Sequence, residues 1–184
     1  MMRFNFKLIY FLVCTLFVFS SCKKVLYSIE LERLINKKVT LTKDLVLVQG
    51  INPFYKYKET KTKVIVWFSP EECSTCRLSS LGTYKTLEEY CCDSTDHVSV
   101  LFIFSPSEEK REVFKEVLDN SSREYPIFVD YNNSFGKKND FLSKKGELHS
   151  FLLDSDNKIV LIGNPMLSNS MLDLYKKKIE ELRK

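Results

Sequence analysis

From residue 63 onward, apolar residues follow two regular spacings. Val64–Phe68 and Val98–Phe104 are continuous apolar runs rich in β-branched and aromatic residues, which is typical of buried strands. Between the two runs, apolar residues recur every three or four positions and predict one face of a helix that begins near Cys73. The residues of this face are Leu78, Leu81, Tyr84, Leu87 and Cys91.

The second half of the chain continues this alternation. Ser105-Pro106 predicts an N-cap followed by the first residue of a helix. Ile127–Val129 is a short strand, and Leu148–Leu153 and Lys158–Ile162 form a hairpin across a turn rich in Asp. A last helix runs from about Ser168 to Leu182. Two strand–helix–strand crossovers predict an α/β fold with a central mixed sheet and helices on both faces.

The N-terminal part divides into two segments. Residues 1–21 resemble a bacterial lipoprotein signal peptide: Arg3 and Lys7 precede the uncharged run Leu8–Phe19, which is shorter than the roughly 20 residues of a spanning helix. Two serines then lead to Cys22, which the resemblance makes the lipidated N-terminus, although Phe19 stands where such signals usually have Leu. Residues 23–62 form an extension for which we expect an edge strand and a short helix. Residues 63–184 form the main domain.

The signal segment determines where the protein is expected to act. It implies an extracytoplasmic, membrane-anchored lipoprotein that faces the periplasm, where thiols can remain oxidised. Simple secretion and an uncleaved signal anchor are the alternatives for this segment.

Composition narrows the possible functions. The formal charge of +4 does not indicate a clustered basic face, so we expect no nucleic-acid partner. With five Gly and neither G-x-G-x-x-G nor G-x-x-x-x-G-K, the chain carries no phosphate-binding loop of these types. Four cysteines remain after Cys14 and Cys22, and they allow three pairings. They are Cys73, Cys76, Cys91 and Cys92.

Three stretches carry a resemblance to membrane-anchored thioredoxin-like proteins of the TlpA/ResA type and to short bacterial thioredoxin-like lipoproteins. They are VIVWFSPEECSTC at 64–76, YPIFVD at 125–130 and HSFLLDSDNKIVLIGNP at 149–165. The resemblance implies a thioredoxin-like fold, with the C-x-x-C of Cys73 and Cys76 between the first core strand and the first helix. It also implies a protein thiol or disulfide as partner and no diffusible cofactor. Asp130, after the short strand, is expected to be structural.

Two positions depart from the family pattern. Glu72, with Glu71 beside it, stands where thioredoxins have Trp before the first Cys. Leu148 stands where the family has a cis-Pro that faces the disulfide and helps to hold the substrate peptide. We therefore treat Glu71, Glu72, Leu148 and the neighbouring His149 as residues that could modify the activity of the cysteine pair.

The C-x-x-C pair predicts a thiol-disulfide oxidoreductase. Cys73, exposed at a helix N-terminus, would be the nucleophile, and Cys76, more buried, would resolve the mixed disulfide. The two glutamates disfavour a thiolate, so we expect the pKa of Cys73 to be nearer to roughly 7 than to about 3.5. The alternatives are a redox-inactive interaction module with a structural disulfide, and a copper- or zinc-binding protein in which His149 approaches the cysteines. We otherwise expect His149 to lie near the surface of its strand.

Overall fold

The computed structural model describes residues 28–49, 60–92, 98–121, 126–142 and 146–183. The chain divides into two units, Met1–Leu34 and Ile35–Lys184. In the first unit, residues 28–34 are helical. The second unit contains the sheet and the cysteine pair.

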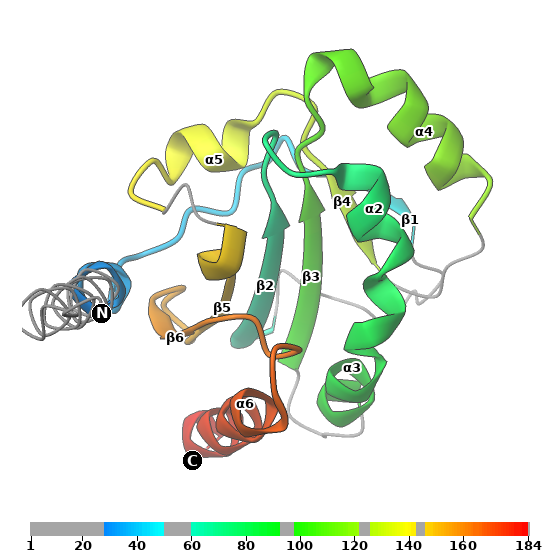
Figure 1. Cartoon of the computed structure of the whole chain (residues 1–184). Helices are drawn as coiled ribbons and strands as arrows, with labels where there is room; N and C mark the ends of the chain where they lie inside the picture. The colour runs from blue at the N-terminus through cyan, green and yellow to red at the C-terminus, as the bar shows by residue number, and fades with distance from the viewer. Residues whose placement is uncertain (1–27, 50–59, 93–97, 122–125, 143–145, 184) are drawn as a thin grey trace, which may run out of the picture. The chain divides into compact units, whose positions relative to one another are not determined.

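A six-stranded mixed sheet forms the centre of the second unit, in the order β1-β4-β3-β2-β5-β6 (Figure 1). Strands β2, β3 and β4 are parallel, whereas β5 pairs antiparallel with β2, β6 with β5, and β1 with β4. The strands are β1 (Val46–Gln49), β2 (Thr62–Phe68), β3 (Val98–Phe104), β4 (Ile127–Val129), β5 (Ser150–Leu153) and β6 (Ile159–Ile162). The predicted mixed sheet with a parallel centre and a closing hairpin is confirmed.

Helices cover both faces of the sheet. One face packs against α2 (Ser74–Ser79), η1 (Leu81–Tyr84), α3 (Lys85–Cys92), α4 (Arg111–Asp119) and α6 (Asn169–Leu182). The other face packs against α5 (Ser134–Lys138), because the ring of Phe135 lies 5.5 Å from that of Trp67, measured between centroids. Alternate residues of β2 point to the two faces, so Val66 and Phe68 join the first layer and Trp67 joins the second.

The predicted helix after Cys73 is divided into three pieces, α2, η1 and α3. The first break falls among Ser79, Ser80 and Gly82, which are poorer helix formers than Ala or Leu. The predicted apolar face is nevertheless correct, because all five of its residues are buried. Burial of that face holds all three pieces against the sheet.

The predicted cap at Ser105 is wrong. A short turn, η2 (Glu108–Lys110), precedes α4, and Ser107 is the residue before it. Ser105 is fully buried, where its hydroxyl accepts a hydrogen bond from Trp67 Nε1 at 3.0 Å and approaches Asp130 Oδ2 at 3.5 Å. The local sequence pattern of a cap was therefore overridden by a tertiary hydrogen bond between strand ends.

Candidate functional site: the cysteine pair and its neighbours

Cys73 and Cys76 form a disulfide at the start of α2, just beyond the carboxyl end of β2. Cys73 is the N-cap residue of the helix, and its sulfur accepts a hydrogen bond from the backbone N–H of Cys76 at 3.4 Å. Both cysteines are exposed, so neither is covered by the rest of the protein. The disulfide thus joins two exposed residues at the start of α2, where another protein's thiol or disulfide could approach.

Glu72, directly before Cys73, has a carboxylate with three partners. Its Oε1 lies 2.9 Å from His149 Nδ1 and accepts from the Ser69 backbone N–H at 3.3 Å. Its Oε2 accepts from Arg77 Nε at 3.1 Å. Because Arg77 directly follows Cys76, this ion pair joins the residues on either side of the C-x-x-C. The negative charge expected to oppose a Cys73 thiolate therefore comes with its own positive partner.

The environment of Glu72 keeps its carboxylate ionised. Burial raises the pKa of Glu72, but the hydrogen bonds from His149 and Ser69 and the charges of His149 and Arg77 lower it, and the net pKa lies below the ordinary value. Only 13% of the side chain is exposed. Glu71, in contrast, is exposed to solvent. The two glutamates, equivalent in the sequence pattern, thus have different environments.

His149 is buried, with 2% exposed, so the expectation that it lies near the surface is wrong. Its ring lies 4.4 Å from that of Trp67, between centroids, and its carbonyl accepts from the Trp67 backbone N–H. The position follows from the sheet, because the residue before β5 lies on the face that Trp67 and α5 cover. A buried imidazole requires a polar partner, and Glu72 provides it.

Leu148, at the family's cis-Pro position, is fully buried and ends the turn η3 (Gly146–Leu148). No cis peptide bond occurs in the part of the chain that the structure describes. Gly146 lies against the Glu72 carboxylate: a Cβ added to it would be 3.1 Å from Glu72 Cδ. The turn before β5 therefore packs directly on the cysteine turn.

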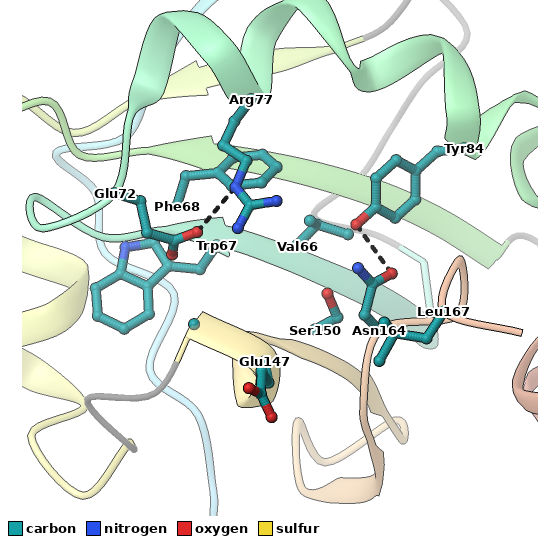
Figure 2. Close-up of a pocket in the computed structure, with 11 residues that line it drawn as sticks. Val66, Trp67, Phe68, Glu72, Arg77, Tyr84, Glu147, Ser150, Asn164 and Leu167 are labelled. Carbon is teal, nitrogen blue, oxygen red and sulfur yellow. Dashed lines mark hydrogen bonds and ion pairs between the residues drawn. The ribbon is translucent and has the colours of Figure 1, made fainter.

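A pocket of about 150 Å³ lies between α2, β2 and the turns that flank β5 and β6 (Figure 2). Arg77 and Tyr84 extend into it from the helical side, and Ser150 and Asn164 face them from the opposite side. The sequence did not mark any of these four as a site residue, and it placed Tyr84 only on the apolar face of the helix. Of the four, only Arg77 could have been singled out from the sequence, because it directly follows the second Cys of the C-x-x-C. The other three come together only through the pairing of β5 with β2.

The structure also bears on other parts of the sequence. Cys91 is buried in the layer under the helices. Among the described residues, no three His, Cys, Asp or Glu side chains gather closely enough to hold a metal ion. No helix within the described ranges is long and apolar enough to cross a membrane. The signal segment, Cys22 and the side chain of Cys92 lie outside the described residues.

No protein-family model matches the chain, and no curated protein matches it. Solved structures are similar to it at low identity. A thioredoxin-like protein from Porphyromonas gingivalis is 19% identical, covering 67% of this chain and 76% of its own, with a TM-score of 0.44. The exposed lipoprotein thioredoxin of Streptococcus pneumoniae is 16% identical, with 73% and 98% covered and a TM-score of 0.46. A yeast mitochondrial 1-Cys peroxiredoxin is 17% identical, with 81% and 76% covered and a TM-score of 0.48.

The strand order, the strand directions and the position of the disulfide define the class of this protein. Parallel β2, β3 and β4, an antiparallel hairpin beside β2, and a C-x-x-C between β2 and α2 are the features of the thioredoxin fold. The chain therefore has a thioredoxin-like fold with a Cys73–Cys76 disulfide, and the predicted fold class is confirmed.

Proposed function

We propose that this protein is a lipid-anchored, extracytoplasmic thiol-disulfide oxidoreductase. The observation that carries the proposal is the Cys73–Cys76 disulfide, exposed at the first turn of α2. A buried disulfide would be inaccessible to a protein substrate, whereas both sulfurs here can be approached from solvent. The fold supports protein thiols as substrates.

Local geometry favours Cys73 as the nucleophile. In the reduced protein, the Cys76 N–H that donates to Cys73 Sγ would stabilise a thiolate at that sulfur. Cys73 is the cap residue of α2 and therefore lies where backbone N–H groups have no helical acceptor. Arg77, one residue beyond Cys76, adds a positive charge that offsets the negative charge of Glu72.

The reaction proceeds through two exchanges. The Cys73 thiolate attacks one sulfur of a partner disulfide, which forms a mixed disulfide and releases the other partner sulfur as a thiolate. The Cys76 thiolate then attacks Cys73 Sγ, which releases the second partner thiolate and closes the Cys73–Cys76 bond. Two electrons pass from this protein to its partner, and the reverse sequence oxidises a partner dithiol.

A redox titration tests this function. The full-length protein is equilibrated in thiol/disulfide buffers, and each Cys is measured by differential alkylation and mass spectrometry. We expect a Cys73–Cys76 potential between about −120 and −270 mV, the range of exchange proteins. A potential below about −300 mV would identify a structural disulfide and overturn the proposal in favour of a redox-inactive interaction module.

The membrane anchor is supported by the sequence of residues 1–22. The basic start, the short apolar run and Cys22 together form the pattern of a lipoprotein signal. Two acyl chains at Cys22 would hold the domain at a membrane surface, where it would meet other extracytoplasmic proteins.

A further inference from the structure

In the pocket beside the cysteine turn, the side-chain oxygens of Glu72 and Asn164 are occupied by donor groups of the protein itself. Both Glu72 carboxylate oxygens are bound, one by Arg77 and the other by His149 and Ser69. Asn164 Oδ1 accepts from Tyr84 OH at 3.2 Å and from the Met166 backbone N–H at 2.8 Å. These bonds leave the pocket walls with donors that have no acceptor.

The two bonds to its oxygen fix the orientation of the Asn164 amide. Burial raises the pKa of Tyr84 even against the hydrogen bond with Ser150, so its hydroxyl remains a donor toward Asn164 Oδ1. With the oxygen held, Nδ2 must turn the other way, and Figure 2 shows it directed toward Ser150 and the interior of the pocket. Among the described residues, Nδ2 has no acceptor.

Arg77 contributes the second donor. Its Nε is bound to Glu72, while Figure 2 shows one of the two terminal nitrogens of the guanidinium directed toward the space above Val66. Within the described part of the chain, these two nitrogens have no acceptor. The side chain is 47% exposed, so a ligand can reach it. Arg77 and Asn164 therefore present donors from opposite sides of one pocket.

We propose that this pocket binds a carboxylate side chain, Asp or Glu, adjacent to the reacting cysteine of the partner protein. The inference rests on the proposed oxidoreductase function, and it specifies which residues the site prefers next to the cysteine of the partner protein. A guanidinium and an amide N–H₂ facing one another match the oxygens of a carboxylate. The pocket volume of about 150 Å³ suits a single side chain of this size.

Two carboxylates of the protein also line the pocket and must be weighed against this inference. Glu72 is paired with Arg77 and His149, so its charge is compensated. Glu147 is exposed at the rim, and Figure 2 shows its carboxylate directed away from Arg77 and Asn164. Water screens a charge in that position, whereas a ligand inside the pocket contacts Arg77 directly.

Exchange with three matched peptides tests the inference. The reduced full-length protein, in mild detergent, reacts with disulfide-linked dimers of acetyl-Glu-Cys-Glu-amide, acetyl-Gln-Cys-Gln-amide and acetyl-Lys-Cys-Lys-amide. The measured quantity is the ratio of second-order rate constants between peptides. Because one thiolate attacks all three peptides, a change in the pKa of Cys73 cancels from this ratio. We expect the wild type to prefer the Glu peptide over the Gln peptide by about threefold or more.

Three variants test which side chains cause the preference for the Glu peptide. Arg77→Gln should remove the preference for Glu, and Asn164→Asp should reverse it in favour of the Lys peptide, because the spare donor becomes an acidic oxygen. Lys85→Gln is the control: it removes one positive charge from an exposed side chain on α3, outside the pocket, and should leave the ratio unchanged.

The possible failures can be told apart. If the Glu-to-Gln ratio is the same in wild type and Arg77→Gln, or the wild type prefers the Lys peptide, the carboxylate pocket is overturned and the oxidoreductase stands. If the wild type exchanges with none of the peptides, the proposed function itself is overturned. If the Glu-to-Gln ratio falls as much in Lys85→Gln as in Arg77→Gln, the preference arises from long-range electrostatic attraction, and the binding pocket is overturned.

Discussion

Glu72 controls how charge is distributed around the cysteine pair. In the sequence, it appears equivalent to Glu71, and both would raise the pKa of the adjacent thiol. In the structure, Glu72 is largely covered and bound to Arg77 and His149, whereas Glu71 is exposed. The carboxylate therefore has two effects that can be separated: it contributes a negative charge near Cys73, and it holds the cysteine turn against the sheet.

Replacing Glu72 with Gln should lower the pKa of the Cys73 thiol. The change removes the carboxylate and leaves the charge of Arg77 uncompensated, which together favour the thiolate by roughly half a unit to one unit of pKa. The measurement is the alkylation rate of the reduced protein as a function of pH. Glu71→Gln serves as the matched control and should produce a smaller decrease, because water screens its exposed charge. An unchanged or raised pKa in Glu72→Gln would contradict this account.

Glu72 should also make stability depend on pH. Its pKa in the folded protein is lower than the ordinary value of 4.5, so its contribution to the free energy of unfolding is present above that value. The contribution is lost as pH falls through the lowered folded pKa. Urea unfolding of the oxidised protein at about pH 6 and about pH 3 should show the difference between wild type and Glu72→Gln shrinking toward the lower pH. A difference that grows toward acid would contradict this prediction.

At the scale of elements, Asp130 joins the end of β4 to the start of α5. Its side chain is fully buried and accepts from the backbone N–H groups of Ser134 at 2.9 Å and Phe135 at 2.7 Å. These are the first N–H groups of α5, which have no acceptor within the helix. Asp130 thereby fixes the helix whose Phe135 packs on Trp67. The same Trp67 ring supports His149.

Asp130→Asn should destabilise the protein by about 2 to 3 kcal/mol, because the amide can accept at only one oxygen and directs its own donors at buried N–H groups. Equilibrium urea unfolding measures the loss. Asp156→Asn provides the control, since that side chain is 68% exposed in the turn before β6, and it should change stability by no more than about 0.5 kcal/mol. Equal effects in both variants would show that burial of Asp130 contributes nothing.

The elements differ in how far the sequence predicts them. Val98–Phe104 and Ile127–Val129 coincide with β3 and β4, because continuous apolar runs between turn residues are local signals. Ser105 shows the limit of such local signals. Its place in a Ser-Pro cap pattern gave no information about its hydrogen bonds with Trp67 and Asp130. The Glu72–His149 contact spans most of the domain sequence, so only the pairing of β5 with β2 brings the two residues together. The cysteine pair was visible in the sequence, whereas its surroundings depend on the tertiary fold.

At the scale of the whole molecule, the proposed anchor would determine which partners the cysteine pair meets. The described residues contain no helix able to cross a membrane. The attachment we propose is through acyl chains at Cys22, the residue that follows the predicted signal segment.

Cys22→Ser should release the protein from the membrane fraction of a Gram-negative host. Without the thiol, no diacylglycerol can be attached, and the protein should shift from the detergent-soluble to the aqueous phase. Phase partitioning and the mass of the N-terminal peptide provide the measurement. Cys14→Ser is the matched control and should remain with the membrane. A wild-type protein whose N-terminal peptide still contains residues 1–21 and carries no acyl chain would instead indicate an uncleaved signal anchor.

The spacing of the two cysteines also determines how long a covalent complex with a partner can last. Their Cα atoms are 5.3 Å apart on one turn, so Cys76 would attack a mixed disulfide at Cys73 intramolecularly, at a high effective concentration. The natural complex would therefore be too short-lived to isolate. Cys76→Ser removes the internal attacker and leaves the partner covalently attached through Cys73, so that mass spectrometry can identify the partner.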